Sequence, residues 1–277
     1  MRVTALPAPT PTLHAPASRS LWEAAIRRLS REGRRRSPKI WRESRMLLES
    51  TRLFRDPVAK GVGFPRGDGR PVFLIPGYLA GDVSLVPLAR ALRRAGYRTK
   101  SAGMRLNIGC ANELLAPIEE RLERHVARSG GRKALLIGQS RGGGFARLLA
   151  ARRPDLVDGL MTLGAPLLDP LAVHIFVILN VGLVGALGSL GVPGLLSLGC
   201  TRDDACCESV RRELDSPLPP STPFVAFYSR SDGIVDWRAC LDPRARLVEV
   251  QSSHCGMAWN ADVLRAMGSE LARDAHG

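Results

Sequence analysis

The sequence has 277 residues, of which 45% are hydrophobic, enough to bury the core of one large domain or of one domain with an extension. Its formal net charge of +14 is uneven, because the first 60 residues hold 14 of the 40 Lys and Arg residues but 5 of the 26 Asp and Glu residues. The remainder therefore has the charge of an ordinary soluble domain. Since no recognised nucleic-acid-binding motif accompanies the basic region, we expect no nucleic acid partner.

Residues 1–19 contain four prolines and no apolar run, which is typical of a disordered leader and not of a secretory signal. We therefore expect a cytoplasmic protein with reduced thiols. The six cysteines show no CxxC pair and no zinc spacing, so no metal site and no cofactor are predicted. Cys200, Cys206 and Cys207 are nevertheless close enough in sequence for a local disulfide.

Residues 20–60 are predicted to form a basic helical extension. The first predicted helix has Ser20 as its N-cap, and the second has Pro38 in its first turn. Each helix places arginines opposite an apolar stripe, which holds Leu21, Ile26, Trp41 and Leu47. The stripe is predicted to pack on the flank of the protein, because glutamates interrupt the basic face at Glu23, Glu32, Glu43 and Glu49. Peripheral contact of residues 20–56 with an anionic membrane is the alternative.

From residue 61 to residue 277, apolar strands alternate with helices. This alternation predicts an α/β fold with a mostly parallel sheet and helices on both faces. The predicted strands are 71–77, a short one within 98–104, 133–138, 157–166, 222–229 and 245–253. The predicted helices are 84–97, 112–130, 142–154 and 260–274.

An insert at about 167–220 interrupts the alternation. No Asp, Glu, Lys or Arg occurs from Leu171 to Thr201, and an uncharged run of this length is long enough for a transmembrane helix. Glycines at every third position from Gly182 to Gly194 are expected to weaken a continuous helix there. We therefore predict an apolar cap at 171–199, or buried packing, in place of a membrane span.

Ser140 follows the strand predicted at 133–138, within Gly138-Gln139-Ser140-Arg141-Gly142, and a helix comes next. In this context G-x-S-x-G forms a nucleophile elbow, whereas a serine on an ordinary turn is the alternative. The small residues two positions before and after Ser140 are required because a Cβ there would contact the neighbouring strand or helix.

A nucleophilic serine needs a base, and the base needs a carboxylate. Of the five histidines, only His254 lies in a loop directly after the last predicted strand; the others are His14, His125, His174 and His276. Asp232 follows a strand and precedes Gly233, which would allow a sharp turn. Asp236 is the alternative, and Asp232 is favoured because it is nearer the strand end.

The oxyanion of an acyl-transfer reaction needs two backbone donors. The first is predicted to be the N–H of Arg141, directly after the nucleophile. The second is predicted to be the N–H of Tyr78 in the loop after the first strand, with Leu79 as the alternative.

Residues 71–272 resemble the α/β-hydrolase superfamily, specifically the bacterial lipase/esterase-like serine hydrolases. The resemblance is carried by PVFLIPGYLAGD, RLNIGC, LLIGQSRGGGFARLLA, LMTLGAPLLDP, YSRSDGIVDW and SSHCGMAWN. It implies a triad of Ser140, Asp232 and His254 in the chain order of that fold, and an acyl-enzyme intermediate. Arg141 departs from the family pattern, in which this position is more often apolar or Gln, and its charge is expected to shape access or substrate choice.

These features predict a serine hydrolase that cleaves a small-molecule carboxylic ester, with an apolar acyl chain suggested by the insert. Thioesterase or acyltransferase activity uses the same triad and is the alternative among enzymes. If the protein is not an enzyme, the alternative is a non-catalytic binding protein with a hydrolase fold.

Overall fold

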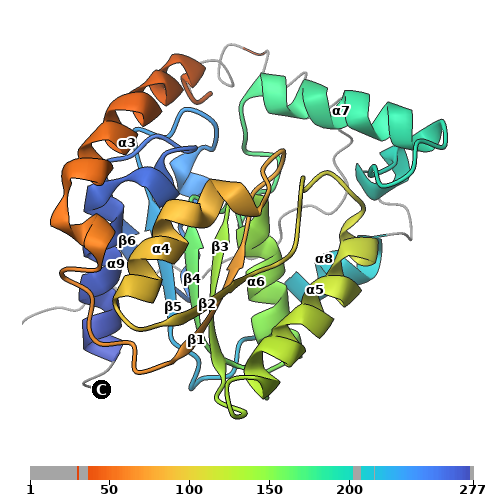
Figure 1. The fold of residues 1–277 in the computed structure, drawn as a ribbon. Coiled ribbons are helices and arrows are strands. Elements are labelled where there is room, and N and C mark those ends of the chain that lie inside the picture. The colour runs from red at the N-terminus through yellow and green to blue at the C-terminus, as the bar shows by residue number, and fades with distance from the viewer. Residues whose placement is uncertain (1–29, 31–36, 202–206, 215, 275–277) are drawn as a thin grey trace, which may run out of the picture.

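The structure is a computed structural model that describes residues 30, 37–201, 207–214 and 216–274 (Figure 1). The predicted leader, residues 1–19, lies outside the described residues. So does the helix predicted from residue 20 to 33, apart from Ser30.

A six-stranded sheet forms the centre of the molecule, and every neighbouring pair of its strands is parallel (Figure 1). The strand order is β2-β1-β3-β4-β5-β6. The strands are β1 (Pro71–Ile75), β2 (Arg98–Ser101), β3 (Ala134–Gln139), β4 (Val157–Leu163), β5 (Phe224–Tyr228) and β6 (Arg246–Glu249). The central strands β1 and β3 are buried throughout, as uninterrupted apolar runs predict for a sheet covered on both faces.

Helices cover both faces of this sheet (Figure 1). On one face lie α4 (Val86–Arg94) and α9 (Ala261–Asp274), with α3 (Met46–Arg55) against α9. On the other face lie α5 (Ala111–Ala127), α6 (Arg141–Arg152) and α8 (Glu208–Leu214). Side chains alternate along each strand, so Leu74 joins the first core and Phe73 the second. The predicted α/β fold with helices on both faces is therefore confirmed.

Short 3-10 helices join these elements. They are η1 (Ile40–Arg45), η2 (Pro57–Lys60), η3 (Asp82–Leu85), η4 (Leu198–Thr201), η6 (Trp237–Cys240) and η7 (Met257–Trp259).

The insert contains α7 (Ile175–Ser189), which lies apart from the sheet at the top of the view in Figure 1. The helix is continuous through Gly182, Gly185 and Gly188, although glycine weakens a helix, and it ends before Gly191 and Gly194. A Cβ on Gly185 would lie 3.1 Å from the Leu198 side chain, and one on Gly188 would overlap the Leu196 carbonyl. These two glycines let the returning chain pack closely on the helix, and this packing outweighs their low helix propensity.

The first residues of the insert are bound to the loop after β5. The His174 backbone N–H donates to the Ile234 carbonyl at 2.7 Å, and Val173 forms an isolated antiparallel bridge with Val235. Within the described ranges, no helix combines the length and apolarity that a membrane crossing needs.

The segment before the sheet contradicts the predicted apolar contact. Trp41 and Leu47 are exposed to 68% and 76%, whereas Glu49 and Leu53 of α3 are buried. The predicted packing of Trp41 and Leu47 on the flank is wrong, because the segment is bound through Glu43 and Glu49, whose carboxylates accept backbone hydrogen bonds. The remaining stripe residues, Leu21 and Ile26, lie outside the described residues.

Candidate active site

Ser140 lies on a strained turn between β3 and α6. Its φ of 52° and ψ of −124° place it in a region that non-glycine residues rarely occupy. A Cβ on Gly142 would lie 2.5 Å from the Pro76 carbonyl oxygen, and one on Gly138 would lie 2.6 Å from Gly143 Cα. Both flanking glycines are thus sterically required, and the turn has the geometry that the G-x-S-x-G motif predicts.

Asp232 and His254 form a buried pair. His254 Nδ1 lies 2.7 Å from Asp232 Oδ2, and the two residues are 5% and 4% exposed. Asp232 Oδ1 accepts from the backbone N–H groups of Ile234 at 2.8 Å and Val235 at 2.7 Å. With a carboxylate at Nδ1, the neutral imidazole holds its proton there and leaves Nε2 as the basic nitrogen.

Asp236, the alternative carboxylate, has a different partner. Its side chain accepts from the Arg238 backbone N–H at 3.2 Å and caps η6. Gly233 lies in a bend, in agreement with the predicted turn, and its φ is not positive. Its lack of a side chain also makes room for Glu43, since a Cβ there would lie 2.8 Å from Glu43 Oε1.

The electrostatics of the pair favour a basic imidazole. Burial lowers the pKa of His254, but the charge and hydrogen bond of Asp232, together with the charge of Glu43, raise that pKa above its ordinary value of 6.5. The imidazolium that forms on proton uptake is therefore stabilised.

The turn that holds Ser140 contacts the loop that holds His254. Gln139 Nε2 donates to the His254 carbonyl at 2.9 Å. Gly164, with φ 57°, passes beside the ring, where a Cβ would lie 3.1 Å from His254 Nδ1. Among the described residues, Ser140 Oγ has no hydrogen-bond partner, so the structure brings the serine loop and the histidine loop together without a bond between the two side chains.

The other histidines lie elsewhere. His125 Nε2 lies 3.0 Å from the Arg98 carbonyl oxygen, and His174 Nδ1 accepts from the Phe176 N–H at the start of α7. His14 and His276 lie outside the described residues.

The loop after β1 passes directly beside Ser140, since a Cβ on Gly77 would lie 3.0 Å from Ser140 Cβ. In the part of the chain that the structure describes, the backbone N–H groups of Tyr78 and Arg141 have no acceptor. The N–H of Leu79, by contrast, points to the Asn107 carbonyl oxygen at 3.4 Å. Tyr78 and Arg141 therefore each hold an available backbone donor in a segment next to the serine.

Sequence reasoning did not assign a role to Asn107, which is fully buried. Its Nδ2 donates to the Pro76 carbonyl at 2.9 Å, and its Oδ1 accepts from Arg141 at 2.9 Å. Arg141 also donates to the Gly109 carbonyl at 2.7 Å. The guanidinium, expected to shape access or substrate choice, is thus bound to the 107–109 loop, and the RLNIGC resemblance was the one signal for this contact.

Glu43 and Glu49 were also missed, because sequence reasoning treated them only as charges interrupting a basic face. Both bind the backbone of the His254 loop. Hydropathy carries no signal for such contacts, which join positions about 200 residues apart.

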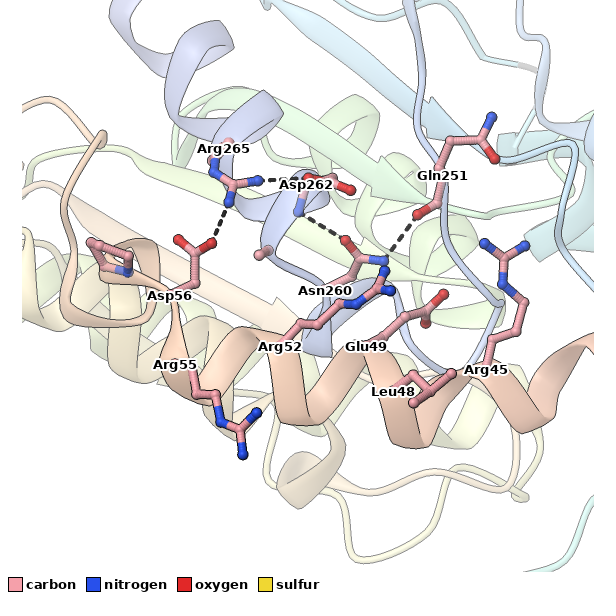
Figure 2. Close-up of a pocket in the computed structure, with 12 residues that line it drawn as sticks. Arg45, Leu48, Glu49, Arg52, Arg55, Asp56, Gln251, Asn260, Asp262 and Arg265 are labelled. Atoms are coloured by element: carbon pink, nitrogen blue, oxygen red, sulfur yellow. Dashed lines mark hydrogen bonds and ion pairs between the residues drawn. The ribbon is translucent and has the colours of Figure 1, made fainter.

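A cavity of about 580 Å³ lies between α3 and α9, and none of the predicted site residues lines it (Figure 2). Figure 2 shows Glu49 and Arg52 projecting from α3 toward Asn260. Arg265 on α9 pairs with Asp262 at 2.6 Å and with Asp56. Neither Ser140 nor His254 lines this charged cavity.

Comparisons with known proteins agree with this architecture. A family model described as the alpha/beta hydrolase fold matches residues 70–182. The structure of Bacillus licheniformis lipase BlEst2 in mature form is similar with a TM-score of 0.55 and 13% identity, covering 76% of this chain and 93% of that chain. The esterase domain of a Rhodothermus marinus protein is similar with a TM-score of 0.50 and 20% identity, covering 76% and 90%. A search of curated protein sequences finds no significant match.

The parallel sheet, the strained serine turn after β3 and the family match define the fold of the protein. The chain has the alpha/beta hydrolase fold, and its resemblance to this superfamily is confirmed.

Proposed function

We propose that the protein is a serine hydrolase that cleaves carboxylic esters through Ser140, His254 and Asp232. The observation that carries the proposal is the buried Asp232–His254 pair, 2.7 Å apart, whose histidine lies on a loop packed against the strained Ser140 turn. A fold alone does not define an activity, whereas this set of side chains supports one.

In the proposed reaction, His254 Nε2 accepts the proton of Ser140 Oγ while Oγ forms a bond to the ester carbonyl carbon. The negative charge on the carbonyl oxygen is stabilised by the backbone N–H groups of Tyr78 and Arg141. The alcohol leaves with the proton from His254, which gives the acyl-enzyme. Water then attacks the acyl group, His254 takes the water proton, and the carboxylic acid is released as Ser140 Oγ regains a proton.

The cap supports an apolar acyl group. The side of α7 that carries Phe176, Leu179 and Leu183 is exposed, and no acidic residue, lysine or arginine lies between Leu171 and Thr201. Tyr78 of the proposed oxyanion loop donates from its hydroxyl to Asn180 Oδ1 on α7 at 3.0 Å. An apolar helix is thus bound directly to the loop next to the nucleophile.

The test is hydrolysis of p-nitrophenyl esters of graded chain length by the wild type and by Ser140→Ala. We expect turnover by the wild type that grows with acyl length and is lost in the variant. Turnover that survives in folded Ser140→Ala would refute the assignment. A matched thioester series identifies thioesterase activity if it is cleaved in preference to the esters.

A further inference from the structure

The segment before the sheet reaches the loops of both proposed partners of Ser140. Glu43 lies on η1, and its Oε1 accepts from the Gly233 backbone N–H at 2.9 Å and from the His254 backbone N–H at 2.9 Å. Its Oε2 accepts from the Cys255 backbone N–H at 2.8 Å. One carboxylate thus joins the residue after Asp232 to His254 itself.

Glu49, one helical segment later, binds the same histidine loop. Its Oε1 accepts from the Ser253 backbone N–H at 2.9 Å and its Oε2 from the Ser253 hydroxyl at 2.6 Å. Glu49 is 7% exposed, and Gly256 has no room for a Cβ because the Glu49 carboxylate occupies that space. Glu49 does not contact the Asp232 loop in any described interaction.

The contacts of Glu49 with Ser253 are buried, which strengthens them, whereas the Glu43 contacts with Gly233 and His254 are partly buried and the one with Cys255 is exposed. Without them, several buried backbone N–H groups in the two loops would lack acceptors, at a cost of about 1–3 kcal/mol for each such group. The loops therefore depend on η1 and α3 for their geometry.

We propose that Glu43 is a positioning residue that holds the Asp232 and His254 loops at the separation their hydrogen bond requires, and that residues 40–55 are thereby an integral part of the active site. This inference rests on the proposed function, since it concerns the same triad. The segment lies outside the region that the family model matches, residues 70–182.

The proposal predicts an effect on His254 that a merely structural role would not produce. The charged and titratable groups around the imidazole are Asp232 at Nδ1 and Glu43 at the backbone, with Glu49 on the neighbouring Ser253. Asp232 and Glu43 both raise the pKa of His254 against the lowering effect of burial. Removing the Glu43 charge must therefore lower that pKa.

The experiment compares Glu43→Gln, Glu49→Gln and Glu120→Gln in the full-length protein. Glu120 is an exposed glutamate on α5 that pairs only with Arg124 in the described interactions, so its variant is the surface control. Two readouts are used: the pH profile of kcat/KM with a p-nitrophenyl ester, and titration of the His254 imidazole by NMR.

We expect Glu43→Gln to reduce kcat by about 10- to 100-fold with a smaller change in KM, because small displacements of catalytic groups are costly. In this variant, the acidic limb of the kcat/KM pH profile and the midpoint of the His254 titration should both move to lower pH. Glu49→Gln should lower the melting temperature with a smaller shift of the titration, and Glu120→Gln should match the wild type.

An unchanged His254 titration and kcat in folded Glu43→Gln would overturn the positioning role. A shifted titration in a protein that cleaves no ester would support the positioning role while refuting the proposed function. The NMR readout therefore separates the two failures.

A second, independent observation concerns three thiols. Sγ atoms of Cys110, Cys200 and Cys207 all lie within 4.8 Å of one another, and those of Cys110 and Cys207 are 3.7 Å apart. The predicted absence of a metal site rested on sequence spacing, and the fold brings Cys110 to the other two from about 90 positions away. Cys206, the third member of the predicted local disulfide set, lies outside the described residues.

The spacing suits a thiolate-bound metal. Two thiolates on a tetrahedral Zn²⁺ with bonds of about 2.3 Å lie about 3.8 Å apart, close to the separation of Cys110 and Cys207. Cys110 and Cys207 are buried, and the buried Arg141 guanidinium interacts electrostatically with all three sulfurs, which offsets the negative charge of three thiolates on a divalent ion. We infer that the cluster binds a thiophilic divalent metal such as Zn²⁺, which would fasten η4 and the start of α8 to the 107–110 loop.

The test is titration of the reduced full-length protein with Zn²⁺ by calorimetry, and with Cd²⁺ by its thiolate charge-transfer absorption. One ion per chain is expected for the wild type and for Cys255→Ser, whose thiol lies outside the cluster. Cys110→Ser and Cys207→Ser should each abolish stoichiometric binding. The inference would be overturned if these two variants bound the metal as well as the wild type does, or if the wild type bound none. A Cys110–Cys207 disulfide in protein purified without reductant would also overturn it.

Discussion

Glu43 accepts a hydrogen bond from the His254 backbone N–H at 2.9 Å, although 211 positions separate the two residues in the sequence. The same carboxylate accepts from Gly233, the residue next to Asp232. A short segment before the first strand is thus bound to both loops that supply the proposed acid and base. The geometry of the candidate site therefore depends on the packing of this segment.

Deletion of residues 1–56 is therefore expected to reduce both the melting temperature and esterase activity, because Glu43, Glu49 and the buried Leu53 are removed together. A chain beginning at residue 37 retains every contact described for η1 and α3 and serves as the control. Thermal unfolding and turnover with one ester measure the two effects. Equal stability and activity of both truncations would contradict the account.

Replacement of Ser140 by glycine should stabilise the protein relative to replacement by alanine. The φ of 52° and ψ of −124° strain any residue with a Cβ, by about 1–3 kcal/mol, whereas glycine adopts such angles freely. Part of this gain is offset by the greater entropy of glycine in the unfolded chain, so we expect a net difference of about 1 kcal/mol. Denaturant unfolding of the two inactive variants measures it, and a more stable alanine variant would show that the turn is unstrained.

The two candidate carboxylates are expected to behave differently. Asp232→Asn should reduce kcat by roughly 10³- to 10⁴-fold, because an amide no longer holds the proton of His254 at Nδ1. Asp236→Asn should leave most of the activity, since Asp236 caps η6 through Arg238. Steady-state kinetics of both folded variants decide between them, and the reverse order would assign the role to Asp236.

The pH profile follows from the electrostatics of His254. Burial lowers its pKa, but Asp232 and Glu43 raise it above 6.5. The proposed base must be neutral, so kcat/KM should rise with pH through a midpoint above 6.5 and be lost as the solution is acidified. The acidic limb of kcat/KM measures the pKa of the free protein. A midpoint below 6.5 would show that burial lowers the pKa of His254 more than Asp232 and Glu43 raise it.

The strands could be predicted from sequence because a parallel sheet covered on both faces needs uninterrupted apolar runs, and PVFLI and ALLIG are such runs. Ser140, Asp232 and His254 could be proposed for a related reason. Each follows a predicted strand, and the carboxyl ends of parallel strands meet at one edge of the sheet.

The predicted apolar stripe failed because hydropathy treats every carboxylate as solvent-exposed. Glu49 is buried since Ser253, 204 positions away, supplies its donors. The role of the α7 glycines could not be predicted for a similar reason. Glycine propensity is local, whereas Gly188 is required by the approach of Leu196. Membrane contact through residues 20–56 stays a prediction.

The most direct test of the central claim is covalent labelling with a fluorophosphonate, which reacts with a serine only where a base and oxyanion donors activate it. The wild type is labelled at graded pH, and the modified residue is identified by peptide mass spectrometry. The account predicts one label, on Ser140, that is absent from Ser140→Ala and strongly slowed in Asp232→Asn. A folded wild-type protein that takes no label, or takes it at another serine, would contradict the assignment of Ser140 as the nucleophile.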